Sequence, residues 1–265
     1  MSVNTSDLQA RLQFALDVAK QASEFILSYY QSSSLAVERK RDTSPVTEAD
    51  RGAEQLIREQ IAREFPGDGV LGEEHGETVG TNAFRWILDP VDGTKSFIHG
   101  VPLFGTLIGL EYEKECVLGV CRFPALNEVV YAMQGGGAWW QQGQGEPQRA
   151  EVSPVSDLSE ALFCITTISG WERIGHKETF DKLRASVNLT RGWGDCYGHA
   201  LVATGRADVM IDPLMNAWDA AALVPILQEA GGSFMDWKGN PTAHGGNGVS
   251  VNAALRPAIL ELLNK

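Results

Sequence analysis

The sequence predicts an α/β protein in which helices cover β-sheets, and three patterns along the chain support this expectation. Residues 8–65 carry apolar side chains at the three-to-four-residue spacing of amphipathic helices. The middle of the chain contains successive β-rich runs separated by turn residues. From about residue 155 onward, β-rich and helical segments alternate.

Two helices are expected at the start of the chain. The first follows the apolar positions within residues 8–26, and Ser6 or Asp7 is its expected N-cap. The second begins near Thr47 and ends before the Pro-Gly-Asp-Gly sequence at 66–69, which favours a turn. This part of the chain therefore predicts a pair of helices that precede the β-rich runs.

Four β-rich runs follow, and we expect them to form a largely antiparallel sheet because only turn residues separate them. They comprise residues 84–90, 104–113, 116–123 and 128–134. The glycines at 135–137 and the QQGQGEPQ sequence at 141–148 predict turns or the tip of a hairpin.

The C-terminal part of the chain shows the alternation that is typical of an α/β unit. Strands are expected at 161–167, 207–212, 233–236 and 248–252, and helices at 176–187, 195–205, 217–232 and 255–264. The change of pattern predicts an N-terminal α+β sub-domain over residues 1–152, which contains the candidate metal-binding loops. A C-terminal α/β sub-domain over residues 153–265 would contain the substrate-binding segment.

The overall composition argues against several classes of protein. The chain has 34 acidic and 22 basic residues, and its net charge of −12 disfavours non-specific binding to nucleic acids or to an anionic membrane surface. The four cysteines lack zinc-site spacing and are too few for a disulfide scaffold, so we expect reduced thiols in a cytoplasmic protein. We expect no signal peptide and no membrane span, since the sequence has no apolar run of about 18 residues.

Acidic residues cluster beside turn residues at three places: GEE at 72–74, DPVDGT at 89–94 and WD at 218–219. Asp89 and Asp92 follow an apolar strand, where two carboxylates repel each other unless a cation lies between them. The candidate donors are all oxygen atoms, which suits Mg²⁺ or Mn²⁺ rather than Zn²⁺. The DPVDGT sequence alone is equally typical of an ordinary turn, so the metal-site hypothesis depends on all three segments together.

The chain resembles the inositol monophosphatase superfamily in four segments. They are SPVTEAD at 44–50, GEEHGE at 72–77, WILDPVDGTKSFIHGVPLFG at 86–105 and WDAAALVPILQEAGG at 218–232. The resemblance extends from about residue 8 to residue 263. It implies an alternating α/β/α/β/α layered sandwich of the inositol monophosphatase and fructose-1,6-bisphosphatase type. It also implies Mg²⁺-dependent hydrolysis of a small phosphomonoester, a homodimer and sensitivity to Li⁺.

The same resemblance assigns metal ligands to positions of this sequence. Glu73, Asp89 and the carbonyl of Val91 would bind one ion. Asp89, Asp92 and Asp219 would bind a second ion, so that Asp89 bridges the two. Two or three Mg²⁺ ions per subunit are implied, with Mn²⁺ able to replace them. Such ions explain why several acidic groups share one pocket.

The resemblance also assigns the residues around the attacking water. Thr94, together with Glu73, would orient this water. Asp50 would lie near the same water, and Lys40 would support the front of the site. The two amides that follow Asp92, those of Gly93 and Thr94, are also placed to face a phosphate.

The segment 191–219 is expected to bind the rest of the substrate. Its RGWGDCYG and DPLMNAWD sequences resemble the histidinol-phosphate phosphatases of this superfamily. The inositol phosphatases typically have GTAA in place of residues 194–197 and His in place of Asn216. Carboxylates at Asp195 and Asp212 would suit histidinol, which carries an ammonium group and an imidazole. The candidate substrate-binding residues are Gly93, Thr94, Arg191, Gly194, Asp195, Asp212 and Asn216.

The sequence leaves several alternatives open. Asp195 could instead be the N-cap of a helix, and Arg191 could contact phosphate or brace the opposing subunit. An inositol-phosphate or sugar-phosphate phosphatase is the next candidate function, followed by a 3′,5′-bisphosphonucleoside phosphatase. A phosphate-ligand sensor without catalysis is the candidate from a different class, although the complete ligand set argues against it.

Overall fold

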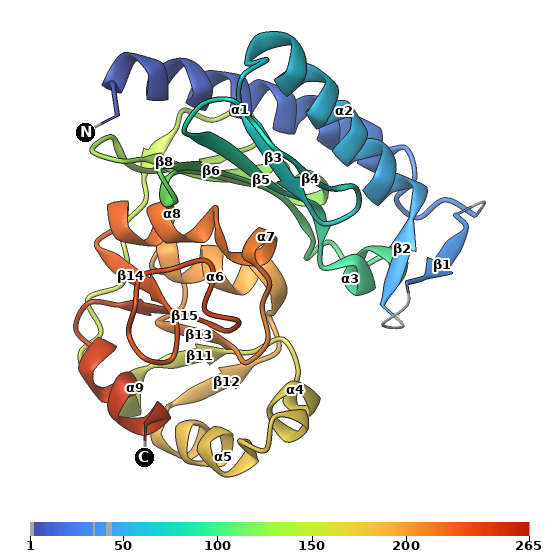
Figure 1. Ribbon diagram of the computed structural model, residues 1–265. Coiled ribbons are helices and arrows are strands. Elements are labelled where there is room, and N and C mark those ends of the chain that lie inside the picture. The colour runs from blue at the N-terminus through green and yellow to red at the C-terminus, as the bar shows by residue number, and fades with distance from the viewer. Residues whose placement is uncertain (1–2, 34, 41–43, 265) are drawn as a thin grey trace.

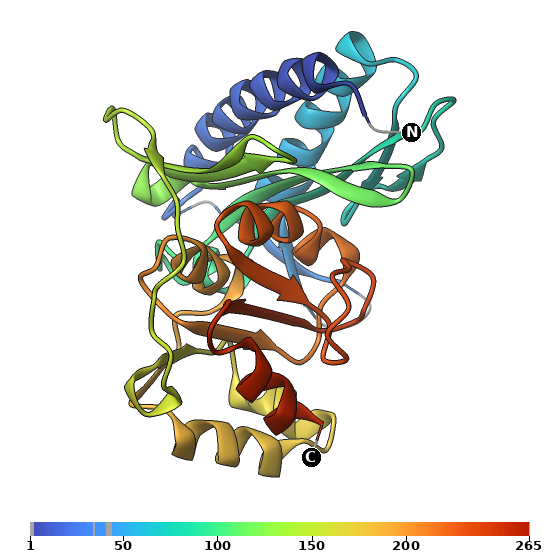
Figure 2. The ribbon, with the colours of Figure 1, turned by 90° about the vertical axis from the view of Figure 1, so that its left-hand side faces the viewer.

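A computed structural model describes residues 3–33, 35–40 and 44–264, and it consists of five layers that alternate between helices and sheets (Figure 1). Two long N-terminal helices form the first layer, and an eight-stranded sheet forms the second. A central layer of helices separates this sheet from a five-stranded sheet, and further helices cover the far face of the latter (Figure 2). This architecture confirms the predicted α/β/α/β/α layered sandwich.

The first layer consists of α1 (Thr5–Leu27) and α2 (Glu48–Glu64), which pack against each other and against the eight-stranded sheet. The start of α2 agrees with the prediction. The N-cap prediction for α1 was wrong, because Asn4 takes this position instead of Ser6 or Asp7. The backbone of Asn4 is extended, and its Oδ1 accepts a hydrogen bond from Ser6 N at 3.0 Å, which satisfies an otherwise unpaired helix amide.

The eight-stranded sheet is antiparallel, as expected, except that β3 pairs in parallel with β5. Its strands are β3 (Gly69–Gly72), β4 (Gly76–Thr78), β5 (Phe84–Asp92), β6 (Gly105–Tyr112), β7 (Glu115–Phe123), β8 (Glu128–Met133), β9 (Gly137–Gln142) and β10 (Gln148–Arg149). They lie in the order β10-β9-β8-β7-β6-β5-β3-β4. Three shorter elements flank this sheet: β1 (Val37–Arg39), β2 (Pro45–Thr47) and the helix α3 (Thr94–Ile98).

The central layer contains α6 (Asp195–Ala203), α7 (Ala217–Ala220) and α8 (Leu223–Glu229). We expected one helix over residues 217–232, but the structure divides this segment into α7 and α8. Pro225 explains the division, because its ring nitrogen cannot donate to the carbonyl of Ala221 four residues earlier. The helical hydrogen-bond pattern is therefore interrupted at residues 221–222, although both residues keep helical backbone angles.

The five-stranded sheet mixes parallel and antiparallel pairs, in the order β12-β11-β13-β15-β14. Its strands are β11 (Leu162–Cys164), β12 (Leu189–Arg191), β13 (Val209–Asp212), β14 (Gly232–Met235) and β15 (Gly248–Asn252). The outer helices are α4 (Ile168–Arg173), α5 (Lys177–Ser186) and α9 (Arg256–Leu263). The first sheet ends with β10 and the second begins with β11, while the division at residues 152 and 153 stays a prediction.

Glycines let the central helices approach the first sheet closely. A Cβ at Gly109 on β6 would lie 2.7 Å from Ala221 Cβ, and one at Gly119 on β7 would lie 2.0 Å from Ala222 O. Side chains at either glycine would push the helices away. This close contact brings α7 over β5 and β6, and so brings Asp219 toward the end of β5.

Short elements account for most of the remaining differences from the prediction. The elements that the sequence did not predict are β1, β2, β3, β4, β9, β10, β12, α3 and α4, all of which contain only two to six residues. Such segments are too short to show a clear apolar period. Among the described residues, no helix is both long and apolar enough to cross a membrane.

Candidate active site

The end of β5 places two carboxylates side by side. β5 pairs with β6 as far as Asp89, the register then shifts, and pairing resumes at Asp92. Asp89 is 2% exposed, and its Oδ1 accepts a hydrogen bond from Val91 N at 3.0 Å. Gly93 follows with a φ of +83°, a left-handed conformation, and a Cβ there would lie 2.9 Å from Leu103 O. Only glycine fits this position without strain, so the turn directly after Asp92 is well defined.

A third carboxylate comes from the C-terminal half of the chain. Asp219 is the third residue of α7, and its Oδ2 accepts a hydrogen bond from Asn216 N at 2.7 Å. One carboxylate oxygen from each of Asp89, Asp92 and Asp219 lies within 4.8 Å of the other two. The structure thus brings together the three residues that we expected to share one metal ion.

Burial and mutual repulsion dominate the electrostatics of this cluster. Burial first, and then the charge of Glu73, raises the pKa of Asp89 well above its ordinary value. Burial and the charge of Asp195 have the same effect on the pKa of Asp92. Burial also raises the pKa of Asp219, to about 7. Carboxylates that resist ionisation together, with only oxygen donors on offer, fit a hard divalent cation such as Mg²⁺.

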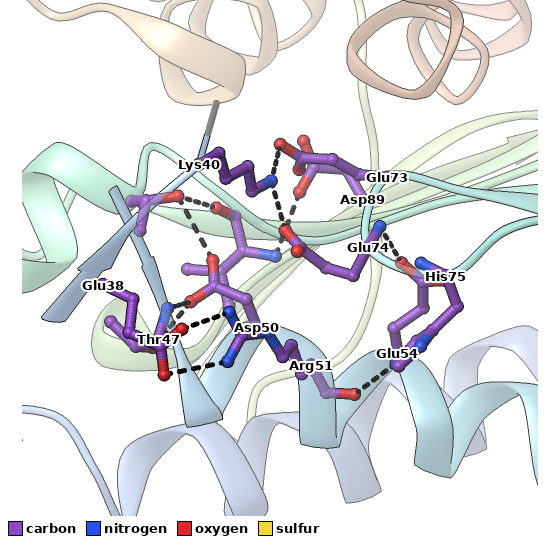
Figure 3. A network of polar contacts seen from close by, with 12 residues as sticks. Glu38, Lys40, Thr47, Asp50, Arg51, Glu54, Glu73, Glu74, His75 and Asp89 are labelled. Carbon is purple, nitrogen blue, oxygen red and sulfur yellow. Dashed lines mark hydrogen bonds and ion pairs between the residues drawn. The ribbon is translucent and has the colours of Figure 1, made fainter. Parts of the chain in front are cut away.

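Glu73 approaches the cluster from the three-residue turn between β3 and β4. Its negative charge contributes to the rise in the pKa values of Asp89 and Asp219. Lys40 Nζ lies 2.7 Å from Glu73 Oε1 and 2.5 Å from Glu74 Oε1 (Figure 3). Burial lowers the pKa of Lys40, but the hydrogen bonds to these two carboxylates outweigh it and raise that pKa. Lys40 therefore forms ion pairs with the acidic turn, and its support of the front of the site stays a prediction.

Thr94 begins α3 and contacts two of the predicted site residues. Its Oγ1 lies 3.2 Å from Asp50 Oδ1 and 3.1 Å from Val91 O. Asp50 is 1% exposed, and its Oδ2 accepts hydrogen bonds from Thr47 N at 2.8 Å and Thr47 Oγ1 at 2.6 Å (Figure 3). Burial raises the pKa of Asp50, although the bonds from Thr47 oppose it. The two predicted catalytic residues Thr94 and Asp50 are thus in direct contact.

A cavity of about 210 Å³ adjoins the acidic cluster. Asp92 and Asp219 line it together with Asp195 and Asp212, two of the predicted substrate residues. Its other charged and hydroxyl-bearing residues were not predicted from the sequence, and they are Lys95, Thr166, Thr167 and Arg173. The cavity therefore has four carboxylates and two cations in its lining.

Asp195 has an unusual backbone conformation at this cavity. Its φ is +51°, which is uncommon for a residue other than glycine, and its amide donates to Thr166 Oγ1 at 2.8 Å. Burial, followed by the charge of Asp212, raises the pKa of Asp195 to about 7, while Lys95 opposes this shift. The alternative that Asp195 caps a helix was wrong: Gly194 is the N-cap of α6, and no side chain makes a capping bond there.

Five of the predicted substrate residues do not line the cavity: Gly93, Thr94, Arg191, Gly194 and Asn216. Arg191 is exposed, and its Nη1 donates to the carbonyl of the preceding residue at 2.9 Å. Gly194 allows close packing, because a Cβ there would lie 2.4 Å from Thr166 Cα. Asn216 is exposed and orients Asp219 through its amide. Substrate contacts by these residues stay predictions.

Two site carboxylates have partners on α6 that the sequence analysis missed. Cys196 N donates to Asp92 Oδ2 at 2.5 Å, which links α6 to the acidic turn. The imidazole of His199 lies 3.3 Å from Asp212 Oδ2 and 2.7 Å from Ser250 Oγ. His199 is fully buried. A backbone donor such as Cys196 N leaves no signature in the sequence.

Comparison with known proteins identifies the family. The sequence model of the inositol monophosphatase family matches residues 7–265. The chain belongs to this family. Among solved structures, SuhB from Bartonella henselae has a TM-score of 0.88 at 28% identity, covering 97% of this chain and 99% of its own. An inositol monophosphatase from Thermotoga maritima has a TM-score of 0.84 at 28% identity, covering 96% and 97%.

Several relatives within this family have a named activity. A histidinol-phosphatase from Chlorobaculum parvum is 47% identical over 92% of this chain and 93% of its own. A histidinol-phosphatase from Mycobacterium tuberculosis is 38% identical over 96% and 97%. An inositol-1-monophosphatase from Caulobacter vibrioides is 32% identical over 94% and 98%. The family and these relatives confirm the predicted enzyme class, a phosphatase.

Proposed function

We propose that this phosphatase hydrolyses L-histidinol phosphate to L-histidinol and phosphate, with Mg²⁺ bound by its acidic cluster. The observation that carries the proposal is the presence of two further carboxylates, Asp195 and Asp212, in the cavity beside the cluster. Histidinol presents an ammonium group and an imidazole, whereas inositol presents only hydroxyl groups. Charge-assisted hydrogen bonds from carboxylates therefore favour histidinol. The higher identity to histidinol-phosphatases than to the inositol phosphatase cited above supports the same choice.

The proposed ligands divide between two ions. Glu73, Asp89 and the carbonyl of Val91 would hold the first, and Asp89, Asp92 and Asp219 the second. When bound, the ions would neutralise the phosphate charge, lower the pKa of a water molecule and stabilise the leaving alkoxide. Mn²⁺ has the same preference for oxygen donors and would replace Mg²⁺.

Thr94 and Asp50 would orient the attacking water together with Glu73. The hydroxyl of Thr94 has a single proton and two acceptors in reach, Asp50 Oδ1 and Val91 O. Its two lone pairs are then available to accept a hydrogen bond from water. Asp50 is itself fixed by the two hydrogen bonds from Thr47, so it holds the Thr94 hydroxyl in one orientation.

The cavity would place the two ends of the substrate differently. Asp195 and Asp212 would bind the ammonium and imidazole groups of histidinol. Lys95 and Arg173 line the same cavity, and their charges would attract the dianionic phosphate group on its way to the metal ions. The predicted contacts of phosphate with the amides of Gly93 and Thr94 belong to the same proposal.

Three further properties belong to this proposal. We infer a homodimer and Li⁺ sensitivity from the family resemblance alone. We also infer a cytoplasmic enzyme, since the four cysteines are free in the structure. The substrate is a small phosphate ester, and the acidic charge of the chain disfavours nucleic acid as a partner.

Phosphate release from a panel of esters tests the proposal directly. The panel contains L-histidinol phosphate, myo-inositol 1-phosphate and glycerol 2-phosphate, each with Mg²⁺ and after chelation. We expect the highest kcat/KM for L-histidinol phosphate and no release from any ester after chelation. Equal kcat/KM for the first two esters would favour a broad inositol-phosphate or sugar-phosphate phosphatase. No release from any ester would favour the non-catalytic sensor.

A further inference from the structure

The turn that carries Glu73 is held by a buried carboxylate outside the predicted site, that of Glu54 on α2. Glu54 is 0% exposed and faces the turn (Figure 3). Its Oε2 accepts a hydrogen bond from Glu74 N at 2.7 Å, and its Oε1 accepts one from His75 N at 3.1 Å. The amide of Glu73 itself donates to Leu88 O at 3.2 Å. All three amides of the turn therefore have acceptors within the protein.

A cation on the same helix balances the buried charge of Glu54. Arg58 Nε donates to Glu54 Oε1 at 2.7 Å. The guanidinium also donates to Gly76 O and, at 3.2 Å, to Thr78 Oγ1, both on β4. Asp50, Glu54 and Arg58 are spaced four residues apart, so they form one polar stripe on α2. This stripe contacts the Thr94 turn at one end and the β3–β4 hairpin at the other.

Gly72, the residue before the turn, has no side chain, and the Glu54 carboxylate occupies the space that a side chain there would fill. A Cβ at Gly72 would lie 2.1 Å from Glu54 Oε1, closer than any real contact. The backbone of Gly72 is outside the left-handed region, so the requirement for glycine here is steric. Even one methyl group at this position would displace the Glu54 carboxylate from the amides of the turn.

We propose that Glu54 is a positioning residue for the metal ligand Glu73. By fixing the amides of Glu74 and His75, it orients the Glu73 carboxylate toward the divalent cation and sets the affinity of the site. This inference rests on the metal site proposed above. Groups that orient a ligand without touching the metal typically change its affinity by about 10–100-fold when they are removed.

Mn²⁺ binding to the metal-free protein, measured by the electron paramagnetic resonance signal of free Mn²⁺, tests this role. Two variants disturb the contact from opposite sides: Glu54→Gln turns a side-chain NH₂ donor toward backbone donors, and Gly72→Ala displaces the intact carboxylate. We expect about 10–100-fold weaker Mn²⁺ binding in both. Glu59→Gln, an exposed residue on the same helix, is the matched control and should bind Mn²⁺ as the wild type does.

Kinetics with Mg²⁺ separate positioning from a purely structural role. Both variants should need a higher Mg²⁺ concentration for half-maximal activity, with kcat at saturating Mg²⁺ within a few-fold of wild type. Unchanged Mn²⁺ affinity with a lowered melting temperature would overturn the inference. If Glu54→Gln fails to fold, Gly72→Ala decides the matter alone, because it keeps both charged side chains, Glu54 and Arg58, in the protein. A wild-type protein that binds no Mn²⁺ would instead overturn the proposed metal site itself.

Discussion

The part of the site that we propose binds metal (the metal side) and the part that we propose binds the rest of the substrate (the substrate side) are built in different ways. On the metal side, buried carboxylates of one long helix, Asp50 and Glu54, hydrogen-bond to the turns that carry Thr94 and Glu73. The substrate side is lined by the connecting residues 166–167 and 213–215, by the short helix α4, and by the start of α6 and the end of β13. Its cations are on exposed residues, while its carboxylates are buried or half-buried.

This difference shows which part of the site is free to vary. The proposed metal ligands depend on a network that reaches into the first layer of the fold, so a change there disturbs several hydrogen bonds at once. Most residues that line the cavity lie in loops or at the ends of short helices and strands, where substitution changes the surface presented to a substrate without disturbing a core. We therefore expect chemistry to depend on the first side and specificity on the second.

Asp92→Asn should have the largest effect and should affect every substrate equally. The variant keeps the shape of the side chain but removes one anionic ligand, so we expect kcat to fall by more than about 100-fold, above the range for groups that only orient a ligand. Steady-state kinetics with several esters measure the effect, and circular dichroism verifies the fold. The exposed Glu146→Gln is the control. Near-wild-type turnover in folded Asp92→Asn would contradict the metal assignment.

Asp195→Asn should separate substrates and so tests the other side. A buried partner left unpaired costs about 1–3 kcal/mol, which corresponds to about one to two decades in kcat/KM. We expect that loss for L-histidinol phosphate and little change for glycerol 2-phosphate, which lacks a cation. Because the Asp195 side chain caps no helix, a change in helix stability does not explain such a loss. An equal loss for both esters would mean that Asp195 supports the metal site and does not bind the substrate cation.

The stability of the metal-free protein should fall as the pH rises from about 4 to about 7. The pKa values of Asp219 and Asp195 are raised from 3.8 to about 7, chiefly by burial. Folding is therefore favoured by their protonation below pH 3.8, and this contribution is lost as the pH rises through about 7. Saturating Mg²⁺ should remove the pH dependence of stability that is due to the proposed ligand Asp219 but leave the pH dependence that is due to Asp195.

Thermal melts of the wild type and of Asp195→Asn between pH 5 and pH 8 measure these two contributions. With Mg²⁺ present, the melting temperature of the variant should depend less on pH than that of the wild type. Identical pH profiles for the two proteins would show that Asp195 is solvated in the folded state.

The smallest effect is expected from the monovalent cation Li⁺. The site formed by Asp89, Asp92 and Asp219 comprises residues from both halves of the chain, and we expect Li⁺ to compete with the second Mg²⁺ ion there. Assays at constant ionic strength, with Li⁺ replacing Na⁺, should show a reduced rate that higher Mg²⁺ restores. Equal rates in the two salts would mean that this position is closed to Li⁺.

Most residues of the metal side could be predicted from the sequence, because they occur in short turn motifs. DPVDGT at 89–94 places two carboxylates and a hydroxyl within six residues, and their types restrict the chemistry. Glu54 was missed because an acidic residue in the middle of a helix is usually solvated. Only the fold shows that it is buried against a turn about 20 residues away.

Fewer residues of the substrate side could be predicted from the sequence, and the reasons are physical. Lys95 directly follows Thr94, so its position beside the acidic turn was a usable signal. No motif marks Arg173, which reaches the cavity only because α4 packs where it does. The layered fold was predicted from long periodic segments and the family resemblance, whereas the break between α7 and α8 needed attention to a single proline, Pro225.

The origin of the three clustered carboxylates has a consequence for the order of events during synthesis. Asp89 and Asp92 leave the ribosome early, but Asp219 follows only after β11 to β13 have been made. Until then the nascent N-terminal half lacks one ligand of the proposed second ion. The sheet surface at Gly109 and Gly119 is also uncovered at this stage, because the helices that pack on it have not been synthesised. A cation that requires all three carboxylates binds only the assembled chain and stabilises it by mass action. Mg²⁺ would thus favour the completed fold over the unfinished chain.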